Sequence, residues 1–316
     1  MKKVKLTADS LQNLAIFLVL FIIFVIGTIV EPDNFLTGSN ISNMMVAASS
    51  IIIVASAVTM VLISGNLDLS VGGIGAMSAV LFGLMTKHGV AVPFAIVITV
   101  LLGALIGFLT GFIITKFLLP SFLISLAFDY IARGIALIGA HGAVVFDLPN
   151  EVTLIGKTIN GIPLPTVYAL ITVIVFIWIQ NKTVFAAQAY SIGANEKAAQ
   201  YSGISRLKVV TIIFTITGAL CAFVGVVITS RFFAADSGIL KSLGNDCIIA
   251  AVLGGTDING GRGTVLGMLI GAFVVTALTN IMNMQGITIY TQDVVRGIVL
   301  ILAILMNNVI RSKVKI

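Results

Sequence analysis

Charged side chains are scarce in this sequence. Only 9% of its 316 residues are Asp, Glu, Lys or Arg, whereas 59% are hydrophobic. Soluble domains carry about 25% charged residues, so a water-soluble protein of this composition would lack a polar surface. The sequence therefore predicts an all-α membrane protein built as a polytopic helical bundle. The net charge of +6 does not indicate nucleic-acid binding, because the basic residues lie mainly in short loops and at the chain ends.

Cysteine is equally rare. Cys221 and Cys247 are the two cysteines, and both fall in or beside apolar segments. This placement predicts buried free thiols rather than a disulfide framework. No Cys/His cluster with metal-ligand spacing occurs in the sequence, so no metal site is expected.

A nucleotide-binding loop is also missing. The nearest match to the pattern G-x-x-x-x-G-K-[ST] begins at Gly255, but Gly261 occupies the position of the lysine. No paired carboxylates at useful spacing and no nucleophile–base set point to an active site. We therefore expect a protein that is not an enzyme, holds no cofactor and cannot hydrolyse ATP by itself.

Apolar segments fill the rest of the chain and predict about ten transmembrane helices, some of them broken. The N-terminal run is interpreted as an uncleaved first span, because it has no small-residue cleavage pattern. The third and eighth segments are short and adjoin glycine-rich polar loops. The segments are approximately 14–30, 44–64, 71–86, 90–115, 121–140, 164–179, 209–229, 243–253, 264–284 and 289–310.

The basic residues predict the orientation of the bundle. With an even number of spans both termini share one side, and cytoplasmic termini satisfy the positive-inside rule. The predicted outside set is small, consisting of Lys87, Lys157, Arg231 and Lys241. The predicted inside set is Lys2, Lys3, Lys5, Lys116, Lys182, Lys197, Arg206, Lys208, Arg262, Arg311, Lys313 and Lys315.

One long polar stretch, residues 180–208, interrupts the apolar chain and is cytoplasmic in this topology. Asn195 is a predicted N-cap, and Glu196 favours the positive start of a helix. Ala198 and Ala199 are strong helix formers, and Gly203 can end the helix. A short capped helix between spans predicts a docking element for a cytoplasmic partner. An ordered connecting loop is the alternative.

Two glycine-rich loops carry unusual polar residues. Residues 64–75 place Asn66, Asp68 and Ser70 between two spans, and residues 254–263 repeat a similar pattern of Asp followed by Gly-Gly-x-Gly. An ionisable group at membrane depth is expensive, and broken helices often build transporter sites. The three polar residues are therefore predicted to lie near a solute pathway. Alternatively, Asp68 only caps the following helix.

Two pairs of opposite charges lie inside predicted spans. Asp129 and Arg133 are four residues apart, and Asp293 and Arg296 are three apart. Each pair shares a helix face and can neutralise itself. The pairs are interpreted as structural ion pairs or as a polar lining for a hydrophilic solute, and Asp129 and Arg133 are included among the predicted pathway residues.

Glycines recur every fourth residue in two segments. One series is Gly103, Gly107 and Gly111, and the other begins at Gly263 and continues through Gly267 and Gly271. Faces of this kind let helices approach closely. We expect tight packing within the bundle rather than a dimer contact.

Three motifs together resemble the ribose/xylose-type permeases of bacterial ABC importers. They are SGNLDLSVGG from Ser64, GANEKAAQYSGI from Gly193 and LGGTDINGGRGT from Leu253. The resemblance extends from the second span to the tenth. It implies a single permease domain of residues 1–316 in the bacterial inner membrane, with residues 180–208 as its coupling loop. The family usually has Gly-Ile before Asp68, where this chain has Asn66 and Leu67, which leaves the sugar open.

The resemblance also implies partners. These are a cytoplasmic ATP-binding subunit that binds the ATP, a periplasmic sugar-binding protein, a second permease subunit forming a homodimer, and membrane lipid. In this interpretation Asn195, Glu196, Ala198, Ala199 and Gly203 belong to the helix that couples to the ATPase.

Other functions stay open. The chain could serve a related importer of nucleosides or branched-chain amino acids. It could also be a secondary transporter driven by an ion gradient, for which Asp129 and Asp293 are the candidate carboxylates.

Overall fold

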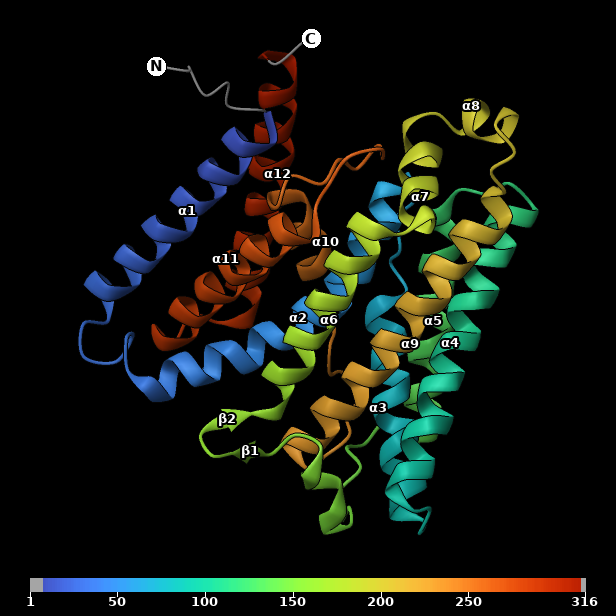
Figure 1. Cartoon of the computed structure of the whole chain (residues 1–316). Coiled ribbons are helices and arrows are strands. Elements are labelled where there is room, and N and C mark those ends of the chain that lie inside the picture. The colour runs from blue at the N-terminus through green and yellow to red at the C-terminus, as the bar shows by residue number, and fades with distance from the viewer. Residues whose placement is uncertain (1–7, 314–316) are drawn as a thin grey trace.

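The computed structural model describes the backbone of residues 8–313 and the side chains of residues 16–305. This part of the chain forms α-helices, one short 3-10 helix and one small hairpin (Figure 1). The helices are α1 Ala8–Val30, α2 Gly38–Ile63, α3 Val71–Lys87, α4 Val92–Lys116, α5 Ser121–Gly139, α6 Leu164–Lys182, α7 Val184–Ala194, α8 Glu196–Tyr201, α9 Arg206–Phe232, α10 Leu243–Leu253, α11 Val265–Met284 and α12 Ile289–Lys313. The remaining elements are η1 Asn150–Leu154, β1 Thr158–Ile159 and β2 Ile162–Pro163.

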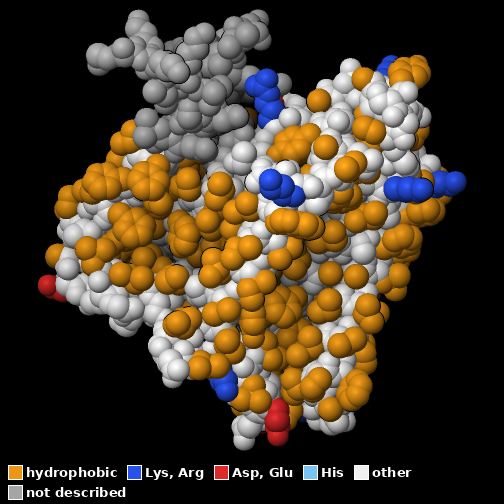
Figure 2. Space-filling model, viewed as in Figure 1, with side chains coloured by type: hydrophobic (Ala, Val, Ile, Leu, Met, Phe, Trp, Pro, Cys, Tyr) orange, Lys and Arg blue, Asp and Glu red, His pale blue; other side chains and the backbone are white. Residues whose placement is uncertain are grey.

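Each predicted apolar segment coincides with a helix, which confirms the all-helical membrane fold. Of the helices described, α2, α4, α5, α6, α9 and α11 are long and apolar enough to cross a membrane. α3 and α10 have 17 and 11 residues and are shorter apolar helices. Hydrophobic side chains cover most of the face seen in Figure 2. The number of crossings stays a prediction.

The two ends of the bundle differ. α8 lies at the same end as the start of α1 and the top of α12, whereas β1 and β2 lie toward the opposite end (Figure 1). We call these the α8 end and the hairpin end. This arrangement agrees with termini that share a side with residues 180–208, while the side of the membrane stays a prediction. Lys2, Lys3, Lys5 and Lys315, which support that prediction, lie outside the described residues.

α2 is the central helix of the bundle. Every residue from Ala48 to Ile63 is buried, and α2 packs against α6, α9, α10 and α11. Cys247 lies in this core with its thiol facing the carbonyl oxygen of Ile51, at 3.7 Å. Cys221 is also buried, and both thiols are free, as the sequence predicts.

The glycine series pack helices together within the chain. A side-chain carbon at Gly107 would overlap the carbonyl oxygen of Phe214, and one at Gly103 would overlap that of Gly218, so α4 lies directly against α9. In α11, Gly271 makes the same kind of contact with Ala250 of α10, and Gly267 makes it with Gly254, directly after α10. Tight internal packing is therefore confirmed at these positions. Gly263, in contrast, precedes α11 and lies against Thr256.

We predict that Gly107→Ala destabilises the protein by about 1–3 kcal/mol, the usual cost of overpacking a close contact. The added methyl group would force α4 away from α9. Gly134→Ala is the matched control, because Gly134 also lies within a helix but has no atom within 4 Å of the added carbon. Thermal unfolding in detergent measures both variants, and equal stabilities would contradict the contact.

Candidate functional site

The loop after α2 runs along a polar stripe of α5. The backbone N–H of Leu67 donates to Oγ of Ser121 at 2.9 Å, and that of Leu69 donates to Oγ of Ser125 at 3.0 Å. The two serines are four residues apart and so share one helix face. An extended backbone inside a membrane protein needs such partners, because no water is available to satisfy it.

Asp129 continues this stripe and caps the start of α3. Its Oδ1 accepts a hydrogen bond of 2.6 Å from the backbone N–H of Gly73, the third residue of α3. Its Oδ2 lies 2.8 Å from Nε of Arg133, which completes an ion pair within α5. A carboxylate at a helix start is stabilised by the helix dipole. The predicted pair is thus formed, and it also joins α5 to α3.

The side chain of Asp68 is turned toward its own loop. It accepts hydrogen bonds from the backbone N–H and the hydroxyl group of Ser70, directly before α3. Asn66 donates to the carbonyl oxygen and the hydroxyl group of Ser64, each at 3.1 Å. All three predicted polar residues, Asn66, Asp68 and Ser70, are buried. Asp68 is not the N-cap that the alternative expects, because Ser70 holds that position and Asp68 accepts from no N–H of α3; it fixes the turn before the helix.

α8 is a short helix with both ends closed by specific contacts. Oδ1 of Asn195 accepts from the backbone N–H of Ala198 at 3.0 Å, which makes Asn195 the N-cap. Gly203 has a φ of +81° and donates to the carbonyl oxygen of Gln200 at 3.0 Å. Glu196 forms an ion pair of 3.4 Å with Arg206 at the start of α9. The predicted capped helix is therefore present.

Three segments that are distant in sequence meet at a backbone junction beside α7. The N–H of Gly261 donates to the carbonyl oxygen of Ile63 at 2.8 Å. Gly193 lies at the end of α7, and a side-chain carbon there would overlap the carbonyl oxygen of Ile63 and the backbone nitrogen of Gly261. Gly260 also packs on the backbone of Gly65, where a side-chain carbon would lie 2.8 Å from its Cα atom. We call these four glycines, Gly65, Gly193, Gly260 and Gly261, the glycine junction. It brings the first motif, the third motif and the stretch leading to α8 into direct contact.

Two side chains from residues 180–208 also hold the loop before α11. The hydroxyl group of Tyr190 donates to the carbonyl oxygen of Gly263 at 2.6 Å. Oε1 of Gln180 accepts from the backbone N–H of Val265 at 2.9 Å, at the first residue of α11. The start of α11 is therefore fixed to α6 and α7, the helices that precede α8.

A polar cavity of about 420 Å³ lies in the half of the bundle nearer the hairpin end. Its walls are the first half of α2, the last turn of α9, the start of α10 and the last turns of α11. The groups able to bind a polar solute include the amides Asn43, Asn280 and Asn283, the hydroxyl of Ser50, and the charged side chains Arg231 and Asp246. Its volume lies in the range of small-molecule sites, about 300–1,000 Å³.

Asp246 connects this cavity to α12. Its Oδ1 lies 3.2 Å from Nε of Arg296, and both side chains are largely buried. Nη1 of Arg296 also lies 2.8 Å from Oδ1 of Asp293, which is more than half exposed. The predicted pair of Asp293 and Arg296 is therefore formed, but Arg296 is shared with a second, buried carboxylate.

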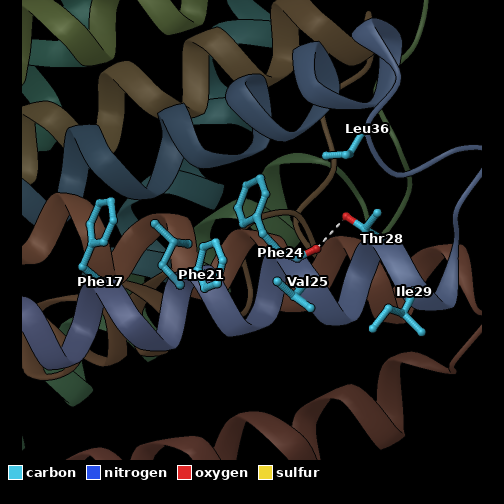
Figure 3. Close-up of a pocket in the computed structure, with 8 residues that line it drawn as sticks. Phe17, Phe21, Phe24, Val25, Thr28, Ile29 and Leu36 are labelled. Atoms are coloured by element: carbon cyan, nitrogen blue, oxygen red, sulfur yellow. Dashed lines mark hydrogen bonds between the residues drawn. The ribbon is translucent and has the colours of Figure 1, made fainter.

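A second cavity, of about 520 Å³, follows one side of α1 and is apolar (Figure 3). Phe17, Phe21, Phe24 and Ile29 line it, with Leu36 from the loop before α2. Its one polar side chain, Thr28, donates to the carbonyl oxygen of Phe24 at 2.8 Å. This cavity suits hydrocarbon, not a hydrated solute.

The sequence matches a transport family over most of its length. The family model described as branched-chain amino acid transport system / permease component matches residues 40–304. The chain belongs to this family. The matched residues include the glycine junction, α8 and the polar cavity, so all three lie within this permease fold.

Individual permeases are also similar to the chain. The ribose import permease protein RbsC of Bacillus subtilis is 35% identical, over 94% of this chain and 93% of that protein. The L-arabinose ABC transporter permease protein AraH of Azospirillum brasilense is 29% identical, over 94% and 88%. The D-allose transport system permease protein AlsC of Escherichia coli is 29% identical, over 93% and 91%. No solved structure matches.

The predicted pathway residues lie outside the polar cavity of this permease. None of Asn66, Asp68, Ser70, Asp129 and Arg133 is among the residues that line it. Leu240 separates the two regions, because it lines the cavity and its side chain packs on Gly75 of α3. The contacts of the predicted pathway residues hold the loop before α3 in place. A role for these residues beside the solute stays a prediction.

Sequence reasoning missed the cavity residues, although a signal for them exists. Thr276, Thr279, Asn280 and Asn283 recur at the spacing of one helix face, which is unusual in an apolar span. Ser121 and Ser125 form a similar stripe with Asp129 at intervals of four. Asp246 had no comparable signal, because its arginine partner is distant in sequence. In the part of the chain described, no group of three His, Cys, Asp or Glu residues could hold a metal.

We predict that Asp129→Ala lowers the free energy of unfolding by about 3 kcal/mol, because it leaves Arg133 unpaired in a low-dielectric site. The double variant Asp129→Ala/Arg133→Met should recover part of this loss, since no unpaired charge remains. Thermal unfolding in detergent measures both.

Asp293→Ala is the control for this experiment. Asp293 also pairs with an arginine on its own helix, but it is exposed, so its loss should cost less than about 1 kcal/mol. A double variant no more stable than Asp129→Ala would refute the ion-pair explanation.

Proposed function

We propose that this chain is the membrane-spanning subunit of an ABC importer for a monosaccharide of the ribose type. The observation that carries the proposal is the similarity, over more than nine-tenths of the chain, to permeases named for ribose import, L-arabinose and D-allose. The chain has no nucleotide-binding loop of its own, so the energy comes from ATP hydrolysed by a separate subunit.

In this proposal α8 docks on the ATP-hydrolysing subunit. Its exposed residues support the assignment, because Glu196, Lys197, Ala198 and Gln200 all face outward. Tyr201 is 90% exposed at the end of the helix. An exposed aromatic side chain on a rigid helix is a typical anchor for a protein partner. Ala199, in contrast, packs inward and holds α8 on the bundle.

The glycine junction supports a route from α8 to the spans. Asn195 caps α8 only two residues after Gly193, which lies against the end of α2 and the loop before α11. Contacts between backbone atoms leave no flexible side chain to absorb a displacement. A movement of α8 therefore shifts the broken helices on both sides of the junction, as expected for rigid elements that switch between two arrangements.

The remaining partners follow from the proposed importer. They are a periplasmic sugar-binding protein that delivers the solute, a second copy of the permease and membrane lipid, in the bacterial cytoplasmic membrane. The chain itself needs no cofactor. The apolar cavity along α1 supports contact with lipid, because only hydrocarbon matches its lining.

A branched-chain amino acid is the second candidate solute. The description of the family model favours it, whereas the named relatives that are similar over the whole chain favour a sugar. An ion-coupled transporter is less well supported. Its candidate carboxylates, Asp129 and Asp293, each lie 2.8 Å from an arginine nitrogen and so are already neutralised.

We predict that a cysteine at Lys197 or Tyr201 crosslinks to a co-expressed ATPase subunit, and that nucleotide changes the yield. Both native cysteines are buried, so the new thiol reports its own position. Lys157→Cys near the β1 strand is the control, because it is exposed but distant from α8. The docking assignment fails if the control crosslinks equally well or if neither α8 position reacts.

We also predict that Gly203→Pro abolishes ATP-driven uptake while the protein still inserts in the membrane. Proline has a fixed negative φ and no N–H, so it removes the turn that ends α8. Gly89→Pro is a matched control, because Gly89 has a φ of +86°, donates one turn hydrogen bond of 3.0 Å and has free space around it. Uptake in membrane vesicles compares the two. Equal losses would show a general folding defect instead of a loss of coupling.

A further inference from the structure

We propose that the polar cavity between α2, α9, α10 and α11 binds the solute as an uncharged, polyhydroxylated molecule, with the Asp246 carboxylate accepting hydrogen bonds from its hydroxyl groups. Arg296 acts as a positioning residue that holds this carboxylate from behind. The inference rests on the proposed importer function and adds the site at which the solute binds.

The location of these polar groups is the first argument. Polar and ionisable side chains inside a membrane bundle are costly, and they line solute paths by default. The cavity gathers polar groups from the ends of four helices, including Asn43 near the start of α2, Arg231 in the last turn of α9 and Asp246 in the first turn of α10. The cavity along α1 is larger but has one polar side chain in its lining, so a polar lining does not follow from cavity size.

The charge of the lining favours a neutral solute. Asp246 and Arg231 are its two charged side chains, with opposite signs, so the lining itself carries no excess charge of one sign. A sugar hydroxyl both donates and accepts hydrogen bonds, and so it needs walls that offer both. The Asp246 carboxylate supplies acceptors, while Arg231 and the amides of Asn43 and Asn283 supply donors. Apolar groups such as Ile51 and Leu243 can cover the C–H faces of a sugar ring.

The orientation of Asn283 is consistent with this division. Its Oδ1 accepts a hydrogen bond of 2.8 Å from Nε2 of Gln292 on α12. Its Nδ2 makes no hydrogen bond among the described residues, so both N–H groups are free to donate to a solute. Asn280 is different, because its amide already exchanges two hydrogen bonds with Asn40.

The contact with Arg296 explains how the carboxylate is held. Nε of Arg296 lies 3.2 Å from Oδ1 of Asp246, and Arg296 itself does not line the cavity. An ionised carboxylate has about four acceptor positions on its two oxygens. The contact with Arg296 therefore leaves positions for solute hydroxyl groups.

The test compares two carboxylates that share one arginine. The complete transporter, with its ATPase and binding protein, is reconstituted in vesicles, and uptake of radiolabelled D-ribose is measured beside ATP hydrolysis. We expect Asp246→Asn to lower ribose uptake about tenfold or more, the usual effect of losing hydrogen bonds to a charged group. Hydrolysis stimulated by the binding protein should change less than about twofold, because α8 and the glycine junction are intact.

Asp293→Asn is the matched control, since it also removes one partner of Arg296 but lies outside the cavity. It should leave both uptake and hydrolysis near the unsubstituted values. If both variants lose uptake equally, or if Asp246→Asn retains full uptake, the binding role of Asp246 is refuted and the importer function stands. If the unsubstituted complex moves L-leucine and not D-ribose, both the sugar importer and this inference fail.

A direct measurement covers the case in which Asp246→Asn misfolds. Thr279 lines the cavity, so a Thr279→Cys variant can be labelled with a small water-soluble thiol reagent while the native cysteines stay buried. Millimolar D-ribose should slow this labelling, and L-leucine should not. Labelling that D-ribose leaves unchanged, in a transporter that imports ribose, would overturn the proposed site.

Discussion

The interior of a membrane contains no water, so every break in a buried helix must find hydrogen-bond partners within the protein. This chain has two such breaks beside its central helices, one before α3 and one before α11. The first is satisfied by Ser121, Ser125 and Asp129 of α5. The second is held by Gln180 and Tyr190, which precede α8. The rest of the architecture depends on these contacts, because they fix where the short helices α3 and α10 stand.

The two breaks are connected through backbone contacts, so a displacement of one break moves the other. Gly193 lies between the end of α2 and the loop before α11, and α8 follows it almost directly. Only glycine allows backbones to approach this closely. An element that docks at α8 would therefore act on both breaks at once, as the proposed coupling to an ATPase requires.

The two cavities illustrate how the membrane distributes polar groups. Along α1 the lining is almost entirely apolar, and such a surface costs nothing in contact with lipid. Between α2, α9, α10 and α11 the lining carries amides, hydroxyls and two opposite charges. Burying these groups is favourable only if they are paired or meet a polar solute. Arg296 pairs with Asp246, and the cavity offers space for a polar solute.

The sequence by itself determined the membrane fold, the approximate positions of its ten apolar helices and the capped helix α8, but not α7, which lies in the polar stretch. Hydropathy depends on local composition, and the cap of Asn195 on Ala198 spans only three residues, so neither needs tertiary information. The ion pair of Asp129 with Arg133 was equally local. Only the tertiary structure decided that Asp129 also caps α3, that four glycines from three segments meet, and that Asp246 shares Arg296 with Asp293. These contacts join residues far apart in the chain, and their geometry is set by how the helices pack, which a single sequence does not encode in any local pattern.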